Sequence, residues 1–281
     1  MHTIIRVLAW MPVVMATSAL AANDHRHDGH GAPPRTDWTA APILLPAGGR
    51  DRTGATYFPA NIVTDDLLIF DPDGSTPRQA DRIDNTWRVA LSNPLRGGFH
   101  WLQARAADDR SIRTATTVWY SPNKGPSPAE MIATVRNGLE IVPLPVPDHN
   151  AYREGSTWRF LVRHDGRPLP QTPVVLDTEF GSSLRTTTDK DGIAHVLFPR
   201  DFDPDLIEKS GAGRARAKFA LSAAHDNAGI RHLTAFNYQY APDLLRQRNL
   251  DAGIGFALLG MLMAAPMLFR RGSRQSTESP T

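Results

Sequence analysis

The chain has 281 residues, with 31 Lys and Arg against 29 Asp and Glu, and it contains no cysteine. This length allows one or two domains with a buried core. Hydrophobic residues at 41% and charged residues at 21% are typical of globular proteins, which argues against a wholly disordered chain or a polytopic membrane protein. The absence of cysteine excludes disulfides, thiolate metal sites and a cysteine nucleophile.

Residues 1–21 have the pattern of a cleaved secretory signal peptide. Arg6 precedes an apolar run, and Ala19-Leu20-Ala21 has the small residues that signal peptidase accepts. A retained anchor is the alternative, but the apolar run is short for a membrane-spanning helix. We therefore expect the mature chain to be exported.

Residues 22–37 form a polar, His-rich tail without large apolar side chains, and such a composition predicts disorder. Between residues 22 and 252 the chain carries 27 Lys and Arg and 28 Asp and Glu, a net charge of −1. This nearly neutral balance does not fit a nucleic-acid-binding protein.

A first β-rich region is predicted at residues 38–147. Leu67–Phe70 is a strand-like run that ends at the turn signal of residues 71–74. Three further strands are predicted at residues 87–91, 99–106 and 111–120. Ser127, Pro128 and Glu130 have the spacing of a capping box, which predicts a short helix ending at Val135.

A second β-region is predicted at residues 148–240. Trp158, Phe160 and Val162 alternate with polar residues, which is the period of a half-buried strand, and Asp165-Gly166 is a turn signal. Further strands are predicted at residues 174–176, 193–198, 216–224 and 232–240. Strands at this spacing with little helix between them indicate an immunoglobulin-like or prealbumin-like antiparallel β-sandwich. We expect either two β-domains in series or one extended β-structure.

A transmembrane helix is predicted at residues 252–269, which carry no charge and approach the length needed to cross the hydrocarbon core. Three arginines in the tail of residues 270–281 favour a cytoplasmic C-terminus. Together with the signal peptide, this predicts a single-pass inner-membrane protein with a periplasmic ectodomain.

Four segments of the second region carry a resemblance to a known family: Leu139–Pro145, Glu154-Gly155, Asp165–Leu169 and Thr188–Ala194. In these segments the chain resembles a bacterial periplasmic family of unknown function that is described as related to nickel and cobalt uptake. The resemblance implies a secreted β-sandwich with a role in transition-metal uptake. The D-G-x-P-L and T-D-x-D-G segments also occur in many other sandwich modules, where they form turns. The separate His-rich tail departs from the family pattern.

The candidate metal ligands are His25, His27 and His30, with Asp24 and Asp28 beside them. Imidazole and carboxylate groups suit Ni²⁺, Co²⁺, Cu²⁺ and Zn²⁺. The glycines among them favour loose capture, because ordering a flexible tail costs entropy. An incidental, soluble tail is the alternative.

The remaining histidines are weaker candidates. His164, His195, His225 and His232 lie on or beside predicted strands of the second region, so two or three of them could share one face, although a histidine on a strand is more often simply packed. His100 follows two glycines at a strand start and is a further candidate ligand. Asp201, Asp203 and Asp205 lack the EF-hand pattern and are expected in a solvated loop.

No nucleophile elbow, metalloprotease motif or phosphate-binding loop occurs, so we expect no enzyme. Two hypotheses remain. In the first, the chain is a membrane-anchored periplasmic accessory that binds or hands over nickel, cobalt or copper to an inner-membrane transporter subunit. In the second, it is a β-sandwich structural or interaction module of the envelope without a metal role.

Overall fold

The computed structural model describes residues 36–48, 54–92, 97–147, 151–211, 213–243 and Met261. Strands dominate these residues, which confirms the mainly-β, antiparallel prediction. The predicted signal peptide, nearly all of the His-rich tail, the cytoplasmic tail and the transmembrane helix apart from Met261 lie outside the described residues. Within the described ranges, no helix is long and apolar enough to span a membrane.

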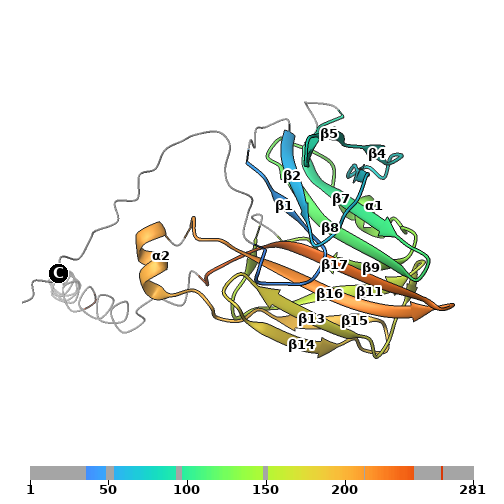
Figure 1. Cartoon of the computed structure of the whole chain (residues 1–281). Coiled ribbons are helices and arrows are strands. Elements are labelled where there is room, and N and C mark those ends of the chain that lie inside the picture. The colour runs from blue at the N-terminus through green and yellow to red at the C-terminus, as the bar shows by residue number, and fades with distance from the viewer. Residues whose placement is uncertain are drawn as a thin grey trace, which may run out of the picture. The chain divides into compact units, whose positions relative to one another are not determined.

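The strands form three sheets (Figure 1). Sheet A has the order β1 (Ile43–Pro46), β2 (Gly54–Ala60), β6 (Thr86–Ala90) and β5 (Asp81–Ile83). Sheet B has the order β14 (Ser183–Thr187), β13 (Pro173–Thr178), β16 (Ala217–Asn227), β17 (Ile230–Ala241), β8 (Ser111–Ser121), β7 (Gly98–Ala107), β3 (Leu67–Phe70) and β4 (Arg78–Gln79), and β10 (Tyr152–Arg153) also pairs with β17. Sheet C contains β12 (Arg167–Pro168), β11 (Thr157–His164), β15 (Ile193–Leu197) and β9 (Leu139–Leu144).

Sheet B joins the two predicted regions. β17 pairs with β8 in parallel, from Arg231 opposite Ser111 to Asn237 opposite Thr117. The strands of the first region and those of the second therefore form one continuous hydrogen-bonded sheet, which is the extended alternative of the sequence prediction.

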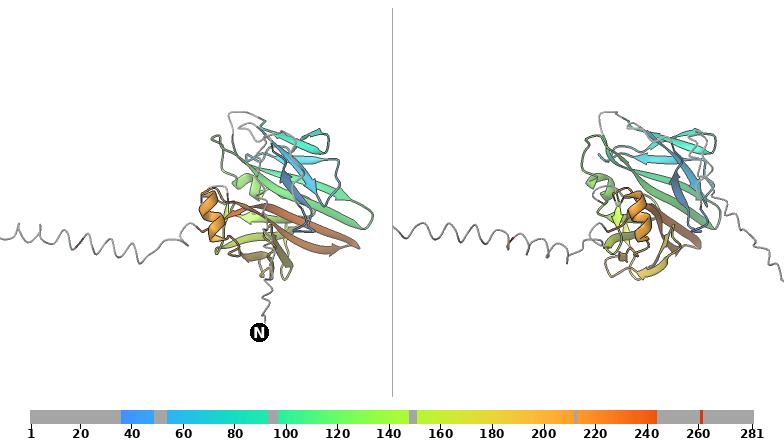
Figure 2. Two further views of the ribbon diagram at one scale, coloured as in Figure 1. Left: turned by 60° about the vertical axis from the view of Figure 1, so that its left-hand side comes forward. Right: turned by 90° about the vertical axis from the view of Figure 1, so that its left-hand side faces the viewer.

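Sheets A and C lie on opposite faces of sheet B (Figure 2), and each of them forms a core with it. Successive residues of a strand point to opposite faces, and on β7 Trp101 joins one core cluster while Leu102 joins another. The Leu102 cluster contains residues of sheet A, such as Leu44 and Val89. The Trp101 cluster contains residues of sheet C, such as Phe160. We call the pairing of sheets A and B the first sandwich, and that of sheets B and C the second sandwich.

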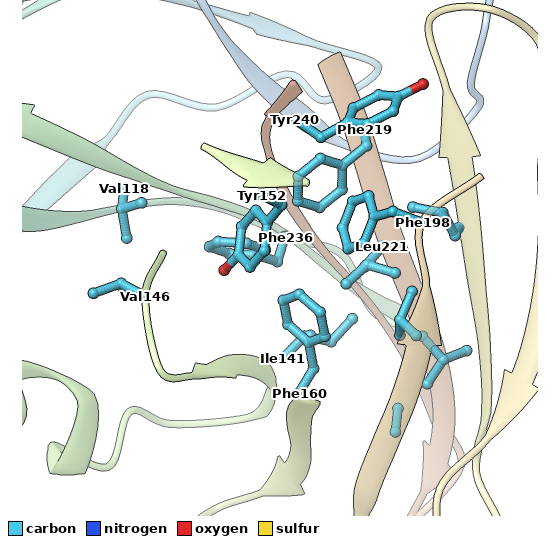
Figure 3. Close-up of a cluster of buried hydrophobic side chains, with 14 of the residues drawn as sticks. Val118, Ile141, Val146, Tyr152, Phe160, Phe198, Phe219, Leu221, Phe236 and Tyr240 are labelled. Atoms are coloured by element: carbon cyan, nitrogen blue, oxygen red, sulfur yellow. The ribbon is translucent and has the colours of Figure 1, made fainter. Parts of the chain in front are cut away.

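Aromatic residues fill the second sandwich (Figure 3). Tyr152 is fully buried, stacks on Phe198 at 5.3 Å between ring centres, and meets Phe219 edge-on at 5.3 Å. Each such ring buries a large apolar area, and aromatic pairs add roughly 0.5–1.5 kcal/mol beyond that burial. Phe70 and Trp101 of the first region belong to the same cluster, so the two regions share a core as well as a sheet.

One polar side chain ties the outer edge of sheet A to sheet B. The Asn237 amide on β17 accepts a hydrogen bond from the Leu44 backbone N–H at 2.8 Å and donates one to the Leu44 carbonyl at 2.7 Å. Both residues are buried. Asn237 thus replaces the neighbouring strand that edge strand β1 lacks, and it satisfies backbone groups that would otherwise be costly to bury.

Three local features differ from the sequence predictions. β9 precedes the boundary predicted at residue 147, yet it pairs with β11 of the second region. Helix α1 (Ala129–Ala133) has Pro128 as its N-cap and ends at Ala133, before the predicted end at Val135. The Ser127 hydroxyl accepts from the Ala129 N–H at 3.3 Å, whereas the predicted capping box would pair it with the Glu130 N–H. The prediction of a solvated loop at Asp201, Asp203 and Asp205 is wrong for the last two residues. Asp203 is the N-cap of helix α2 (Pro204–Ser210), and its side chain accepts a hydrogen bond from the Asp205 N–H at 2.8 Å.

Candidate functional site: a groove and a histidine cluster on the sheet C side of sheet B

A groove of about 520 Å³ lies on the face of sheet B that sheet C leaves uncovered at the β3 and β7 end. Its floor comes from alternate residues of these two strands, and its wall is the segment 135–137 that leads from α1 to β9. The lining residues are Asp66, Leu68, Phe70, Pro77, Gln103, Arg105, Ala107, Val135, Arg136 and Asn137. We call this surface the junction groove.

The junction groove combines apolar and cationic groups. Val135 is 55% exposed and Leu68 is 36% exposed, so both offer apolar surface to a ligand. Arg105 is exposed, whereas Gln103 is buried. Gln103 Oε1 and Arg136 Nε are buried and have no hydrogen-bond partner within the described part of the chain. Among the described lining residues Asp66 is the one carboxylate, and it accepts from the Gln79 amide.

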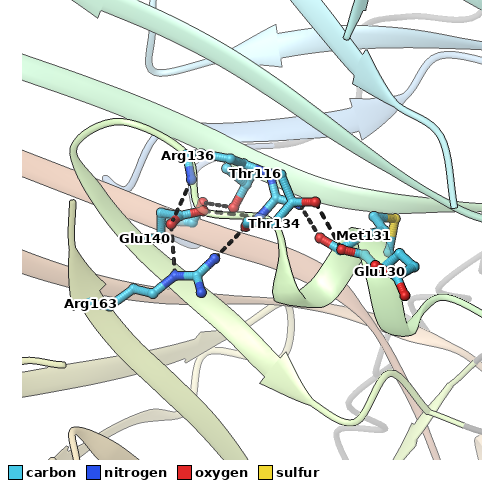
Figure 4. Close-up of polar contacts among 8 residues, drawn as sticks. Thr116, Glu130, Met131, Thr134, Arg136, Glu140 and Arg163 are labelled. Atoms are coloured by element: carbon cyan, nitrogen blue, oxygen red, sulfur yellow. Dashed lines mark hydrogen bonds and ion pairs between the residues drawn. The ribbon is translucent and has the colours of Figure 1, made fainter. Parts of the chain in front are cut away.

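A buried ion network holds the groove wall in place (Figure 4). The Glu140 carboxylate on β9 accepts from Arg136 Nη1 at 3.0 Å and from Arg163 Nε at 2.8 Å. Arg136 also donates to the Met131 carbonyl at 2.6 Å, and Arg163 donates to the Thr134 carbonyl at 2.5 Å. The network therefore ties β9 and β11 of the second sandwich to the end of α1.

The same arginine also contacts the first region. The Arg136 guanidinium lies 4.8 Å from the ring centre of Phe70 and 4.3 Å from that of Trp101. Cations are attracted to aromatic faces at these distances. Burial lowers the pKa of Arg136, while the Glu140 carboxylate opposes that shift.

A histidine cluster lies at the neighbouring open end of the second sandwich. His164 ends β11, while His225 on β16 and His232 on β17 are directly paired across the hairpin. The His164 ring centre is 4.6 Å from that of His232 and 5.2 Å from that of His225. Asp165, the first residue of the β11–β12 turn, accepts a hydrogen bond from the Gly138 N–H at 2.6 Å. This bond attaches the cluster to the residue that directly precedes β9.

The charges around the cluster favour neutral imidazole at His232. Burial lowers the pKa of His232, His164 and Arg105 lower it further, and the Asp165 carboxylate opposes them. Asp165 itself has a lowered pKa, chiefly because the Gly138 N–H donates to its ionised form. The exposed Arg105 lies between the cluster and the junction groove. It lines the groove, and its positive charge lowers the pKa of both His232 and Asp165.

The other predicted site residues lie elsewhere. Asp24, His25, His27, Asp28 and His30 are outside the described residues. Among the residues that the structure does describe, no three His, Asp or Glu side chains are arranged so that they could hold a metal ion. His195 lies apart from the cluster, with its Nε2 3.6 Å from Asp189 Oδ2.

His100 is a buried structural residue of the first sandwich. Its Nδ1 lies 2.8 Å from Asp71 Oδ1, and its ring packs on Trp119 at 4.9 Å. Burial of Asp71 opposes ionisation, but hydrogen bonds from His100, Arg78 and Ser92 outweigh it and hold the pKa of Asp71 well below its usual value.

Asp201 likewise serves the fold. Its carboxylate accepts from the hydroxyls of Thr178 at 2.8 Å, Ser182 at 2.7 Å and Tyr240 at 2.8 Å. These bonds attach the segment before α2 to β13 and β17.

The comparisons with known proteins identify no family for this chain. No protein-family model matches the chain, and no curated protein matches it. Among solved structures, it matches a segment of a 1.5-MDa bacterial ice-binding adhesin with 13% identity and a TM-score of 0.23, over 68% of this chain and 57% of that chain. A second structure, of a Ca²⁺-stabilised adhesin with which an Antarctic bacterium binds ice, gives the same identity and TM-score and is covered to 44%.

A two-domain fibronectin type III segment of chicken tenascin matches with 9% identity and a TM-score of 0.21, over 71% of this chain and 98% of that chain. The chain thus spans about half the length of the two adhesin structures. TM-scores this low carry no information about function. The class that the fold itself defines is a mainly antiparallel β-sandwich protein, here with two sandwiches on one shared sheet.

Proposed function

We propose that the folded part of this chain is a non-catalytic interaction module of the bacterial cell envelope. It is exported by the signal peptide at residues 1–21 and held at the inner membrane by the helix at residues 252–269, with the sandwiches in the periplasm. The module binds an acidic segment of a partner protein in the junction groove.

The observation that supports this proposal is the composition of the groove. Arg105 places positive charge beside the exposed apolar side chains of Leu68 and Val135, and the buried Arg136–Glu140–Arg163 network behind them has two cationic groups for one carboxylate. The carboxylate of Asp66 accepts a hydrogen bond from Gln79. A segment that carries a carboxylate next to an apolar residue complements this surface. Because the buried Arg136–Glu140–Arg163 network fixes the wall, the groove is preorganised, which lowers the entropy lost on binding.

Site-specific photo-crosslinking in the native cell tests the proposal. A photoreactive residue at position 135 should give one discrete adduct, which Arg105→Glu abolishes by reversing the charge. The matched control is position 197, where Leu197 is equally exposed at 55% but lies on β15, away from the groove. Equal adducts at both positions, or an adduct that Arg105→Glu leaves unchanged, would refute binding in the groove.

A second candidate function is metal handling, in which the His-rich tail captures nickel, cobalt or copper and passes it to an inner-membrane transporter subunit. It is favoured by the spacing of His25, His27 and His30 beside Asp24 and Asp28. The test is a titration of the full chain and of a His25→Ala, His27→Ala, His30→Ala variant with Ni²⁺, Co²⁺ and Cu²⁺. Loss of binding sites in the variant supports capture by the tail, and unchanged stoichiometry contradicts it.

A further inference from the structure

The histidine cluster brings together three imidazoles from two facing sheets. His225 and His232 occupy paired positions on β16 and β17, so their side chains leave sheet B on the same face. His164 belongs to sheet C and approaches them from the opposite side of the sandwich. The three strands are parts of the rigid core, since Val162, Ala223 and Thr234, two residues before or after each histidine, are all buried.

The ring spacing matches that of imidazoles on one ion. A nitrogen ligand lies about 2.0–2.1 Å from Zn²⁺, which places the ring centre roughly 3.2 Å from the ion. Two such rings at angles between a right angle and the tetrahedral angle have centres about 4.5–5.2 Å apart. The observed separations of 4.6 Å and 5.2 Å from His164 to its two neighbours fall within this range.

Two ring nitrogens of the cluster are buried without a partner. His164 is 9% exposed and His232 is 7% exposed, and neither His164 Nε2 nor His232 Nδ1 has a hydrogen-bond partner within the described residues. Buried polar atoms are normally satisfied, and an exception calls for an unseen water or ion. With the two ring centres 4.6 Å apart, one ion that both atoms reach would satisfy them.

A carboxylate lies beside one of these rings. His164 Nδ1 is 3.3 Å from Asp165 Oδ2, and Nε2 is the ring nitrogen on the other side. In metal-binding histidines a carboxylate or carbonyl usually lies next to the ring nitrogen that does not bind the ion. Asp165 is itself held by the Gly138 N–H, so the position of this carboxylate is built into the β11–β12 turn.

We propose that His164 Nε2 and His232 Nδ1 bind one divalent transition-metal ion, with His225 as the third ligand and water completing the coordination. No three donors converge among the described residues, so the proposal requires His225, which is only partly buried, to rotate its side chain toward the ion. Imidazole nitrogens without thiolates suit Zn²⁺, Co²⁺, Ni²⁺ and Cu²⁺. The positive charge of Arg105 opposes the ion and Asp165 favours it. This site stands apart from the tail proposal, because it uses none of the tail histidines.

The test is a Co²⁺ titration of the full chain in which His25, His27 and His30 are replaced by Ala, followed by the visible absorption of the bound ion. We expect one Co²⁺ per chain with nitrogen coordination, and displacement by Zn²⁺. Absence of binding by this tail-substituted chain overturns the proposal, whatever the point variants do. If the tail-substituted chain binds fewer ions than the full chain but keeps one Co²⁺ site, the result supports the cluster. It would also show that the tail histidines are not the sole metal ligands of the chain.

Point variants then locate the site. In the tail-substituted background, His232→Gln should weaken Co²⁺ binding at least tenfold, and His225→Gln should weaken it less. His195→Gln is the matched control, since His195 is exposed on the same sandwich but lies outside the cluster, and it should leave binding unchanged. Circular dichroism of each variant checks the fold. An effect of His195→Gln equal to that of His232→Gln overturns the assignment.

Discussion

Removal of the Glu140 carboxylate should be among the most destabilising single changes in this protein. Glu140 is 3% exposed and is the ion-pair partner of two guanidinium groups that are themselves buried. Glu140→Ala would leave the charges of Arg136 and Arg163 uncompensated in the protein interior, and breaking a buried pair in this way costs about 3–5 kcal/mol. It also removes the acceptor of the Arg136 backbone N–H.

Urea denaturation followed by tryptophan fluorescence measures this cost, because Trp101 lies against Arg136. Asp65→Ala is the matched control: it breaks an ion pair with Arg82 whose side chains are 93% and 51% exposed, and it should not measurably change stability. The triple variant Arg136→Met, Glu140→Leu, Arg163→Met removes all three charges, so it should recover most of the loss, since replacing buried ions by apolar groups of similar size is often neutral.

The reasoning fails if Glu140→Ala lowers the unfolding free energy by less than about 1 kcal/mol, which would place it among ordinary substitutions. It also fails if the triple variant is as unstable as Glu140→Ala alone. In that case the cost would come from lost packing or from the lost contacts of Arg136 with Phe70 and Trp101, and not from uncompensated charge.

Three further predictions follow from single contacts. Asn237→Ala leaves the Leu44 N–H and carbonyl buried without the Asn237 amide, and at about 1–3 kcal/mol for each unsatisfied group it should cost roughly 2–6 kcal/mol in chemical denaturation. The pKa of His232 is lowered from 6.5 in the folded chain, so below that pH the unfolded state binds more protons than the folded state. The unfolding free energy should therefore fall as the pH drops below about 6.5. His232→Gln should make this pH dependence weaker. Gly192→Ala should lower the melting temperature much more than Gly181→Ala: both glycines have positive φ, but a Cβ at residue 192 would lie 2.8 Å from Pro168 Cβ, whereas none of the described atoms lies within 4 Å at residue 181.

The strands were predictable wherever the pattern is local. The predicted run Leu67–Phe70 is β3, and the predicted strand at residues 232–240 lies within β17. The pairing of β17 with β8 was not predictable, because it joins residues that are more than 100 positions apart in the chain. In the structure Thr114–Trp119 and Thr234–Phe236 are buried on both faces, which is typical of strands in the centre of a sheet, but burial can be read only once the fold is known.

The candidate site divides in the same way. Asn227 pairs with Ile230 around Ala228 and Gly229, which both have positive φ, as a two-residue hairpin turn requires. That short turn sets the register, and the register places His225 opposite His232, so this half of the cluster could be derived from the sequence once the turn was recognised. His164 could not be added by such reasoning, since it comes from a different sheet and meets the pair only because the two sheets pack face to face. The packing of the two sheets depends on the shared core of Phe160, Phe219 and Phe236. Apolar residues several positions away from the histidines therefore bring His164 to the pair formed by His225 and His232.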